Sequence, residues 1–368
     1  MKSNTLFPST TNANRDSNKA VSYFEFWPTW IIYTPVALQW LWLAIRYRSM
    51  TLPLIANPHL TVSGMVGVAK SELMQQASGE CDEVILNWEI HRINSKALES
   101  QLEDWLQRLQ QQKIDFPFVC KPDIGCRGSG VKLVKDKEQL LTIMAHYPNG
   151  STLMAQKLAS WEPEAGIFFV RRPNERYGKI ESLTLKYNPS VVGNGVDTLE
   201  ELVKKDNRAS KLISIYKQRH LQNWEAIIPL HQYYSLVFSS SHCRGAIFRD
   251  ARHLITEALT EKINQIMQGL PEFHYGRLDV KFLDIASLQA GENLEIVEIN
   301  GASAESIHIW DKDASLISAI KTLLWQYNTL FQIGSINRQR GFKTPAIKTI
   351  LKLWHKERKL TKHYPSTD

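Results

Sequence analysis

Two short stretches near the end of the chain carry polar side chains two residues apart, the spacing that puts them on one face of a strand. Their oxygen atoms could bind a cation, and the arginine among them could bind an anion. In "YGRLDVKF", Arg277 and Asp279 are two residues apart, and in "LEIVEIN" the same spacing separates Glu298 from Asn300. Side chains alternate along a strand, so each pair points to one face. If the two strands are antiparallel neighbours, the three oxygen donors converge with the arginine beside them.

Two carboxylates and a carboxamide, without histidine or cysteine, suit a hard cation such as Mg2+ or Mn2+ rather than zinc. The alternative is a surface hairpin with ordinary polar positions. Apolar residues flank the donors and favour buried strands, in which carboxylates need charged partners. The sequence therefore predicts a metal site made of Asp279, Glu298 and Asn300.

A glycine-rich segment, "KPDIGCRGSG", lies between two apolar stretches that are predicted to be strands. Gly125, Gly128 and Gly130 let backbone N–H groups approach an anion closely. Lys121 stands at the end of the first strand, where its ammonium group can reach a phosphate. The segment is neither a Walker loop, since GK[ST] is missing, nor a Rossmann loop, since a strand follows it. Taken alone, it is either a phosphate-covering loop or a glycine-rich hairpin.

The elements that must position these residues are strands and helices in mixed order, without an internal repeat. Apolar alternation predicts most of the strands, and helical periodicity predicts long amphipathic helices between them. The segment "ASLQAGEN", which joins the two donor strands, is predicted to be a turn, and "LPLIANP" is predicted to be a short strand that ends in an Asn-Pro turn.

A tryptophan-rich apolar segment near the start, "FWPTWIIYTPVALQWLWLAIRYR", admits three interpretations. It is a buried helix of the first domain, an interfacial helix with aromatic anchors, or a membrane-spanning helix. Pro28 and Pro35 interrupt it, so the helix expected after Pro35 is shorter than the roughly 20 residues that span a bilayer. Residues 1–20 are rich in Ser, Thr and Asn, lack a signal-peptide pattern and are expected to be disordered.

Composition limits the class of protein. The 368 residues are 43% apolar, enough for a sizeable core, and the net charge is +7. No RNA-binding signature or familiar recognition helix accompanies this basic excess, so no nucleic acid partner is expected. The four cysteines have no zinc or disulfide spacing and fit a reducing cytoplasm. We expect a cytoplasmic protein, with segments 27–48 and 342–363 as candidates for contact with the inner face of a membrane. A solvated face is the alternative for the basic second segment.

The order of the motifs resembles the ATP-grasp superfamily, and specifically the D-alanine–D-alanine ligase and cyanophycin-synthetase-like carboxylate–amine ligases. The resemblance covers about residues 116–311 and rests on the strand, lysine and glycine loop, followed by "PEAGIFFV", "KYNPSVVGNGVDTLEELV", "GRLDV" and "EIVEIN". It implies an α+β fold whose two lobes hold ATP between them. It also implies an Mg2+-dependent ligase that activates a carboxylate as an acylphosphate, releases ADP and joins the acyl group to an amine.

Two other functions remain open beside ligation: an ATP-grasp phosphotransferase, and a membrane-peripheral protein that binds ATP without turnover. The resemblance also suggests a division of the chain. Residues 1–20 are disordered, 21–113 form the hydrophobic helix and a small α/β domain, 114–190 the lobe with the glycine loop, 191–334 the lobe with the metal site, and 335–368 a basic tail or helix. The oligomeric state cannot be inferred from these motifs.

The resemblance implies a role in ATP binding for several residues. Lys121 and the loop residues after it match the phosphate-binding segment, while Gln156 and Leu158 fall where the family's hinge meets the adenine. Glu164 matches the acid that accepts the ribose hydroxyl groups. Lys70 is the candidate for the additional ATP lysine of the preceding domain.

Other residues match the reacting centre of the family. Lys186 matches the lysine of the second lobe that faces the phosphates, and Arg277 matches the arginine that stabilises the tetrahedral oxyanion. Among the three metal ligands, Glu298 is the expected bridge between two ions.

The chain departs from the family pattern at two places. The glycine loop carries Arg127 and Gly128 where the ligases usually have serines, and "GASAESIHIWD" replaces the proline-glycine-methionine turn after the metal ligands. This second departure argues against D-alanine as the acceptor. Ser303, Glu305 and Ser306 are therefore the residues at which we expect the acceptor.

Overall fold

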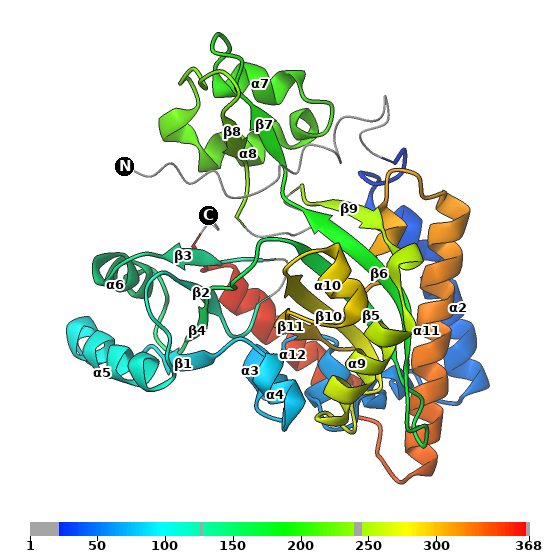
Figure 1. Cartoon of the computed structure of the whole chain (residues 1–368). Coiled ribbons are helices and arrows are strands. Elements are labelled where there is room, and N and C mark those ends of the chain that lie inside the picture. The colour runs from blue at the N-terminus through cyan, green and yellow to red at the C-terminus, as the bar shows by residue number, and fades with distance from the viewer. Residues whose placement is uncertain (1–21, 126–127, 239–244, 366–368) are drawn as a thin grey trace.

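The computed structural model describes residues 22–125, 128–238 and 245–365, and their arrangement is shown in Figure 1. The predictions for residues 1–20 and for Arg127 lie outside the described residues. Two antiparallel sheets dominate the described part, and a two-stranded hairpin forms a third, smaller sheet. The expected α+β fold, with two lobes that face one cavity, is confirmed.

The four-stranded sheet carries the glycine loop. In spatial order its strands are β1 (Trp88–Arg92), β4 (Thr152–Lys157), β2 (Phe118–Pro122) and β3 (Lys132–Val134). Helices α5 (Leu98–Gln111) and α6 (Lys137–Ala145) cover it and bury Trp105 and Met144 against the sheet. Both β1 and α5 precede residue 114, so this lobe includes a strand and a helix from the segment in which we expected a separate small domain.

The five-stranded sheet carries the two polar strands that contain Arg277, Asp279, Glu298 and Asn300. In spatial order its strands are β11 (Leu294–Asn300), β10 (Tyr275–Phe282), β5 (Glu164–Val170), β6 (Lys179–Tyr187) and β9 (Ile247–Asp250). As predicted, β10 and β11 are antiparallel neighbours. Asp279 lies opposite Glu298 and Arg277 opposite Asn300, and a bulge at Val297 interrupts the register just beyond them.

Helices cover both faces of the five-stranded sheet. On one face lie α3 (Lys70–Met74), α4 (Glu80–Val84), α9 (Glu257–Gln268) and α10 (Ile285–Ala290). On the other lie α2 (Thr29–Arg46) and α11 (Leu316–Gln339).

Two local predictions were wrong. The "ASLQAGEN" segment forms helix α10 instead of a turn, because the side chain of Asp284 caps its first turn and Gly291 ends it in the left-handed region. The "LPLIANP" segment forms a 3-10 helix, η1 (Leu52–Ile55), which is buried against α11 instead of pairing as a strand.

The tryptophan-rich segment forms α2, an 18-residue helix that includes Pro35 and packs along α11. One side of α2 is buried, with Ile32, Val36 and Leu43 in the core. The other side exposes large apolar side chains: Trp30, Leu38, Leu41, Trp42 and Ile45. Over the described ranges, no helix is both long enough and apolar enough to cross a membrane.

Two further units complete the fold. The hairpin of β7 (Ser190–Val192) and β8 (Tyr233–Ser235) packs with α7 (Leu199–Lys205) and α8 (Ile213–Arg219) in a separate small core, which lies at the top of Figure 1. The basic helix α12 (Ile347–Thr361) has no buried residue. It brings Tyr364 to the four-stranded sheet, where its hydroxyl donates to the Ile124 carbonyl at 2.7 Å.

Candidate active site

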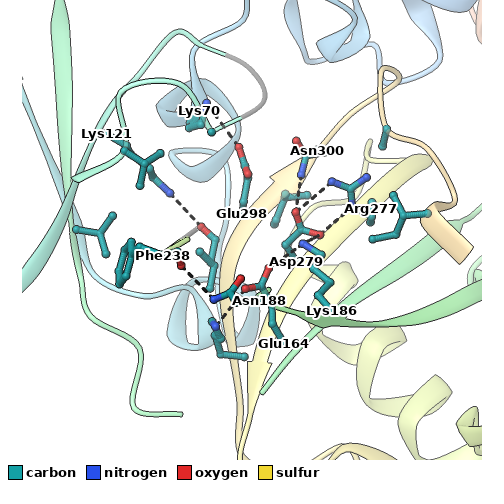
Figure 2. A pocket seen from close by; sticks show the side chains of 18 of the residues that line it. Lys70, Lys121, Glu164, Lys186, Asn188, Phe238, Arg277, Asp279, Glu298 and Asn300 are labelled. Carbon is teal, nitrogen blue, oxygen red and sulfur yellow. Dashed lines mark hydrogen bonds and ion pairs between the residues drawn. The ribbon is translucent and has the colours of Figure 1, made fainter. Parts of the chain in front are cut away.

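A cavity of about 1930 Å³ lies between the two large sheets and is lined by residues from both. Ligand pockets in proteins commonly measure roughly 300–1,000 Å³. The cavity therefore has room for a nucleotide and a second substrate. Figure 2 shows its polar centre, with Lys121 on one side and the side chains of β10 and β11 on the other.

The side chain of Asp279 is the centre of the charge cluster on the five-stranded sheet. Its carboxylate accepts from Arg277 Nε at 2.8 Å and Nη2 at 3.1 Å, and Lys186 Nζ lies 2.9 Å away. Burial opposes the charge of this carboxylate, but Arg277 and Lys186 outweigh it and hold its pKa well below its usual range. Asp279 is therefore ionised at every pH near neutrality.

A second carboxylate, Glu164, extends this cluster along β5. It pairs with Lys186 at 2.8 Å and with Lys281 at 3.1 Å (Figure 2 shows the first pair). Burial alone would raise the pKa of Glu164, but the two lysines lower it. Lys186 lies between the two carboxylates, which raise its pKa against the effect of burial. The five-stranded sheet thus presents fixed, mutually neutralised charges to the cavity.

The opposite wall presents Lys121, which has only neutral partners. Its Nζ donates to Gln156 Oε1 at 2.7 Å and to the Val297 carbonyl at 3.4 Å. Among the described residues, no carboxylate forms an ion pair with it. Burial lowers the pKa of Lys121 to about 8, although Glu298 at longer range opposes this. A buried ammonium group with neutral partners favours an anion from solution as its counter-ion.

Lys70 connects the glycine loop to β11. It donates to the Gly125 carbonyl at 2.9 Å and lies 3.5 Å from Glu298 (Figure 2). Lys70, Lys121 and Glu298, which are far apart in the sequence, thus line the same cavity.

The glycines of the glycine loop differ in what they contact. Gly125, Gly128 and Leu158 line the cavity. Gly130 instead contacts Tyr147, whose hydroxyl donates to the Gly130 carbonyl at 3.0 Å. Its φ is +73°, and a Cβ atom at this position would collide with the Tyr147 hydroxyl, so glycine is needed there. The position of Gly130 is thus accounted for by turn geometry.

The three side chains expected to hold a metal ion lie side by side, but in this structure they form hydrogen bonds and ion pairs with other side chains. Asn300 Nδ2 lies 3.3 Å from Asp279 Oδ2, and Glu298 is opposite Asp279 across the strand pair. Within the described part of the chain, no group of three or more His, Cys, Asp and Glu side chains is placed to hold a metal. Two carboxylates and one amide oxygen nevertheless fit Mg2+, which commonly completes its shell with water and substrate phosphates.

Several cavity residues were not predicted from the sequence. Lys281 could have been found, because it continues the alternation of Arg277 and Asp279 along β10. Tyr33 on α2 and Trp310 could not, since both reach Glu305 from elements whose packing leaves no local pattern.

Comparison with known proteins gives likenesses of structure alone. No family model matches the chain, and no curated protein does. Solved structures that match include D-alanine–D-alanine ligase from Bacillus anthracis (13% identity, 76% of this chain and 72% of that chain, TM-score 0.39). They also include D-cycloserine synthetase (11%, 70% and 69%, TM-score 0.37).

A bifunctional glutathione synthetase from Pasteurella multocida also matches, with 15% identity over 70% of this chain and a TM-score of 0.35. The chain spans only 35% of the length of that protein. TM-scores of this size do not support a functional assignment, and the function is therefore argued from the site itself.

Proposed function

We propose that the chain is an ATP-dependent carboxylate–amine ligase of the ATP-grasp type. One observation carries this proposal. A single cavity holds a buried lysine that lacks a carboxylate partner and, across from it, two carboxylates with an arginine at the reacting centre. The first feature suits the phosphates of a nucleotide, and the second suits a cation and a developing oxyanion.

The proposed ATP site lies mainly on the four-stranded sheet. Lys121 and Lys70 would neutralise phosphate charge, and the glycine loop, including Gly125, would cover the phosphates. Leu158 lines the cavity where the adenine would lie, with Gln156 fixed beside it by Lys121 and the Val297 carbonyl. Glu164 is the candidate acceptor for the ribose hydroxyl groups.

The proposed metal ligands are Asp279, Glu298 and Asn300. When bound, Mg2+ would offset the charge of the ATP phosphates. Loading such a site requires that Asp279 exchange at least one of its present contacts with Arg277 and Lys186. Arg277 would then be free to turn toward the acyl group.

The proposed reaction has two steps. A substrate carboxylate oxygen attacks the γ-phosphorus of ATP, the bond to the β-phosphate oxygen breaks, and an acylphosphate and ADP form. The neutral amine nitrogen then attacks the acyl carbon, the bond between that carbon and the phosphate oxygen breaks, inorganic phosphate leaves with the proton that the nitrogen gives up, and an amide remains. Lys186 would hold the transferred phosphoryl group, and Arg277 would stabilise the oxyanion that develops on the acyl oxygen. Closure of the site would keep water from the acylphosphate.

The proposal is tested by a coupled assay of ADP release over amino acids, hydroxy acids and short peptides, with Mg2+ and ATP present. Release that requires both a carboxylate and an amine supports ligation. A phosphorylated product formed without an amine would indicate a phosphotransferase instead. ATP binding without any release of ADP would indicate a binding protein, an outcome against which Arg277 argues because binding alone needs no oxyanion donor.

We further propose a cytoplasmic location with peripheral contact at the inner face of a membrane. The outer side of α2 exposes Trp30 (71% exposed) and Ile45 (80%), and Arg46 and Arg48 follow at its end. Aromatic and apolar side chains beside basic ones suit an anionic bilayer surface. On α12, Ile347, Leu351 and Trp354 are exposed among lysines and offer a second such surface.

Co-sedimentation with vesicles of phosphatidylcholine, with and without phosphatidylserine, tests the membrane proposal. Wild type is expected to bind only the anionic vesicles, and Trp30→Ser with Trp42→Ser is expected to reduce that binding. Equal recovery of wild type and variant would contradict a role for α2. A concentration-dependent dimer in light scattering would instead assign this side of α2 to a second copy of the chain.

A further inference from the structure

One carboxylate in the cavity wall, Glu305, differs from Asp279, Glu164 and Glu298, the acidic side chains near the reacting centre. It lies after β11, in the segment that departs from the family pattern, and next to the 3-10 helix η7 (Ile307–Trp310). One oxygen of its side chain accepts from the hydroxyl of Tyr33, and the other accepts from the indole N–H of Trp310 at 3.2 Å. Both donors are neutral, so neither offsets the charge of the carboxylate.

The carboxylates near the reacting centre have basic partners. Asp279 and Glu164 pair with Lys186, and Glu298 pairs with Lys70. In residues 22–125, 128–238 and 245–365, no Lys, Arg or His side chain pairs with Glu305. Burial raises the pKa of Glu305, and the hydrogen bond from Trp310 offsets this only in part. A desolvated carboxylate without a counter-ion favours a cationic ligand.

The position of Glu305 places such a ligand beside the reacting centre. The Glu305 backbone carbonyl accepts from Arg277 Nη1 at 3.1 Å, so the residue adjoins the arginine proposed to stabilise the oxyanion. The aromatic rings of Tyr33 and Trp310 also line the cavity, and aromatic faces attract ammonium groups. An anionic phosphate would be repelled here, which separates this end of the cavity from the Lys121 end.

We propose that Glu305, held by Tyr33 and Trp310, binds the ammonium group of the amine substrate. This inference rests on the proposed ligase function and specifies its acceptor as an amine that arrives as a primary ammonium ion and releases one proton to solvent before its nitrogen attacks the acyl carbon. It also gives the N-terminal helix α2 a part in the site, since Tyr33 belongs to α2. Glu305 is thus a specificity residue that the acyl-activation step does not need.

The test compares two nucleophiles in wild type and in Glu305→Gln. One is the amino acid that gives the highest ADP release among glycine, β-alanine, D-alanine and the proteinogenic amino acids. The other is hydroxylamine, which is uncharged near neutral pH and traps an acylphosphate as a hydroxamate. Losing a hydrogen bond to a charged group costs roughly 1.5–3 kcal/mol, so KM for the amino acid should rise roughly 10- to 100-fold. Hydroxamate formation and ATP affinity should stay within about twofold of wild type.

Tyr33→Phe removes a single hydroxyl and should raise the same KM by less, which keeps the inference testable if Glu305→Gln folds poorly. Glu295→Gln is the matched control, because Glu295 lies on β11, bonds Ser160 and does not line the cavity. Equal losses with both nucleophiles, or an unchanged KM for the amino acid, would overturn the assignment of Glu305. If wild type yields neither ADP nor hydroxamate with any carboxylate, the proposed ligase function itself fails.

Discussion

The two sheets that face the cavity handle charge in opposite ways. The five-stranded sheet presents Asp279 and Glu164 already paired with Arg277, Lys186 and Lys281. The four-stranded sheet presents Lys121 with neutral partners only. One wall is neutralised within the protein, whereas the other is completed only when an anion binds.

This difference suggests that the two walls have different functions, one in the reaction and the other in binding. Groups fixed by one another can stabilise charge that develops in a reaction, because they need little reorganisation. A buried ammonium group without a counter-ion is costly in the unliganded protein and is therefore available for binding. The comparison predicts that substitutions of Asp279 and Arg277 affect stability and turnover, and that substitution of Lys121 affects ATP affinity.

The largest effect is expected for Asp279→Asn. The variant keeps the shape of the side chain but leaves Arg277 and Lys186 without their shared carboxylate. Breaking a buried ion pair in this way costs about 3–5 kcal/mol, which should appear in the free energy of unfolding measured with urea. Glu103→Gln, which removes an exposed pair with Lys137, is the control and should stay within about 0.5 kcal/mol of wild type. Equal stability of Asp279→Asn and wild type would show that this wall is not held by its charges.

Arg277→Lys should have the next largest effect, this time on turnover. It keeps a positive charge near Asp279 but removes the fork of donors that would reach the oxyanion. We expect ADP release at saturating substrates to fall roughly 100- to 1000-fold, with the Kd for ATP almost unchanged. If the variant lost only ATP affinity, Arg277 would be assigned to the nucleotide site. The proposed difference between the two walls would then be wrong.

Lys121→Met is expected to affect ATP binding more than it affects stability. Loss of a charged hydrogen-bond donor should weaken ATP binding roughly 10- to 100-fold. The free energy of unfolding should change much less than in Asp279→Asn, because no carboxylate loses its partner. Calorimetric titration and urea unfolding of the same preparation check both statements. A variant that binds ATP as wild type does would contradict the role of Lys121.

The smallest effect concerns pH. With a pKa of about 8, Lys121 is mostly protonated at pH 7 and mostly neutral at pH 9. ATP affinity should therefore decrease up to about tenfold over this range, and Lys121→Arg should abolish the decrease. The unfolded chain keeps this proton up to the ordinary pKa of 10.5, so Lys121 makes the unliganded protein more stable as pH rises from about 8 toward 10.5.

The site could be predicted from the sequence where the pattern is local. Strand alternation correctly placed Arg277 with Asp279, and Glu298 with Asn300, on neighbouring antiparallel strands. It did not predict that β1 would join β4, about 60 residues later, because strand pairing at that range leaves no trace in either segment.

The charge pairs of the site could not be predicted from the sequence either. Lys186 was expected to face phosphates, but no local pattern pairs it with Asp279, 93 residues away. Tyr33 meets Glu305 across a separation of 272 residues. Such contacts follow from how sheets and helices stack, which residue periodicity does not encode.

Calorimetric titration with ATP in the presence of Mg2+ tests the central claim most directly. We predict that wild type binds one ATP per chain, and that Lys121→Met and Glu298→Gln, one from each wall, both weaken binding. Absence of binding in wild type, or binding that neither substitution changes, would contradict the proposal that the two sheets hold ATP between them.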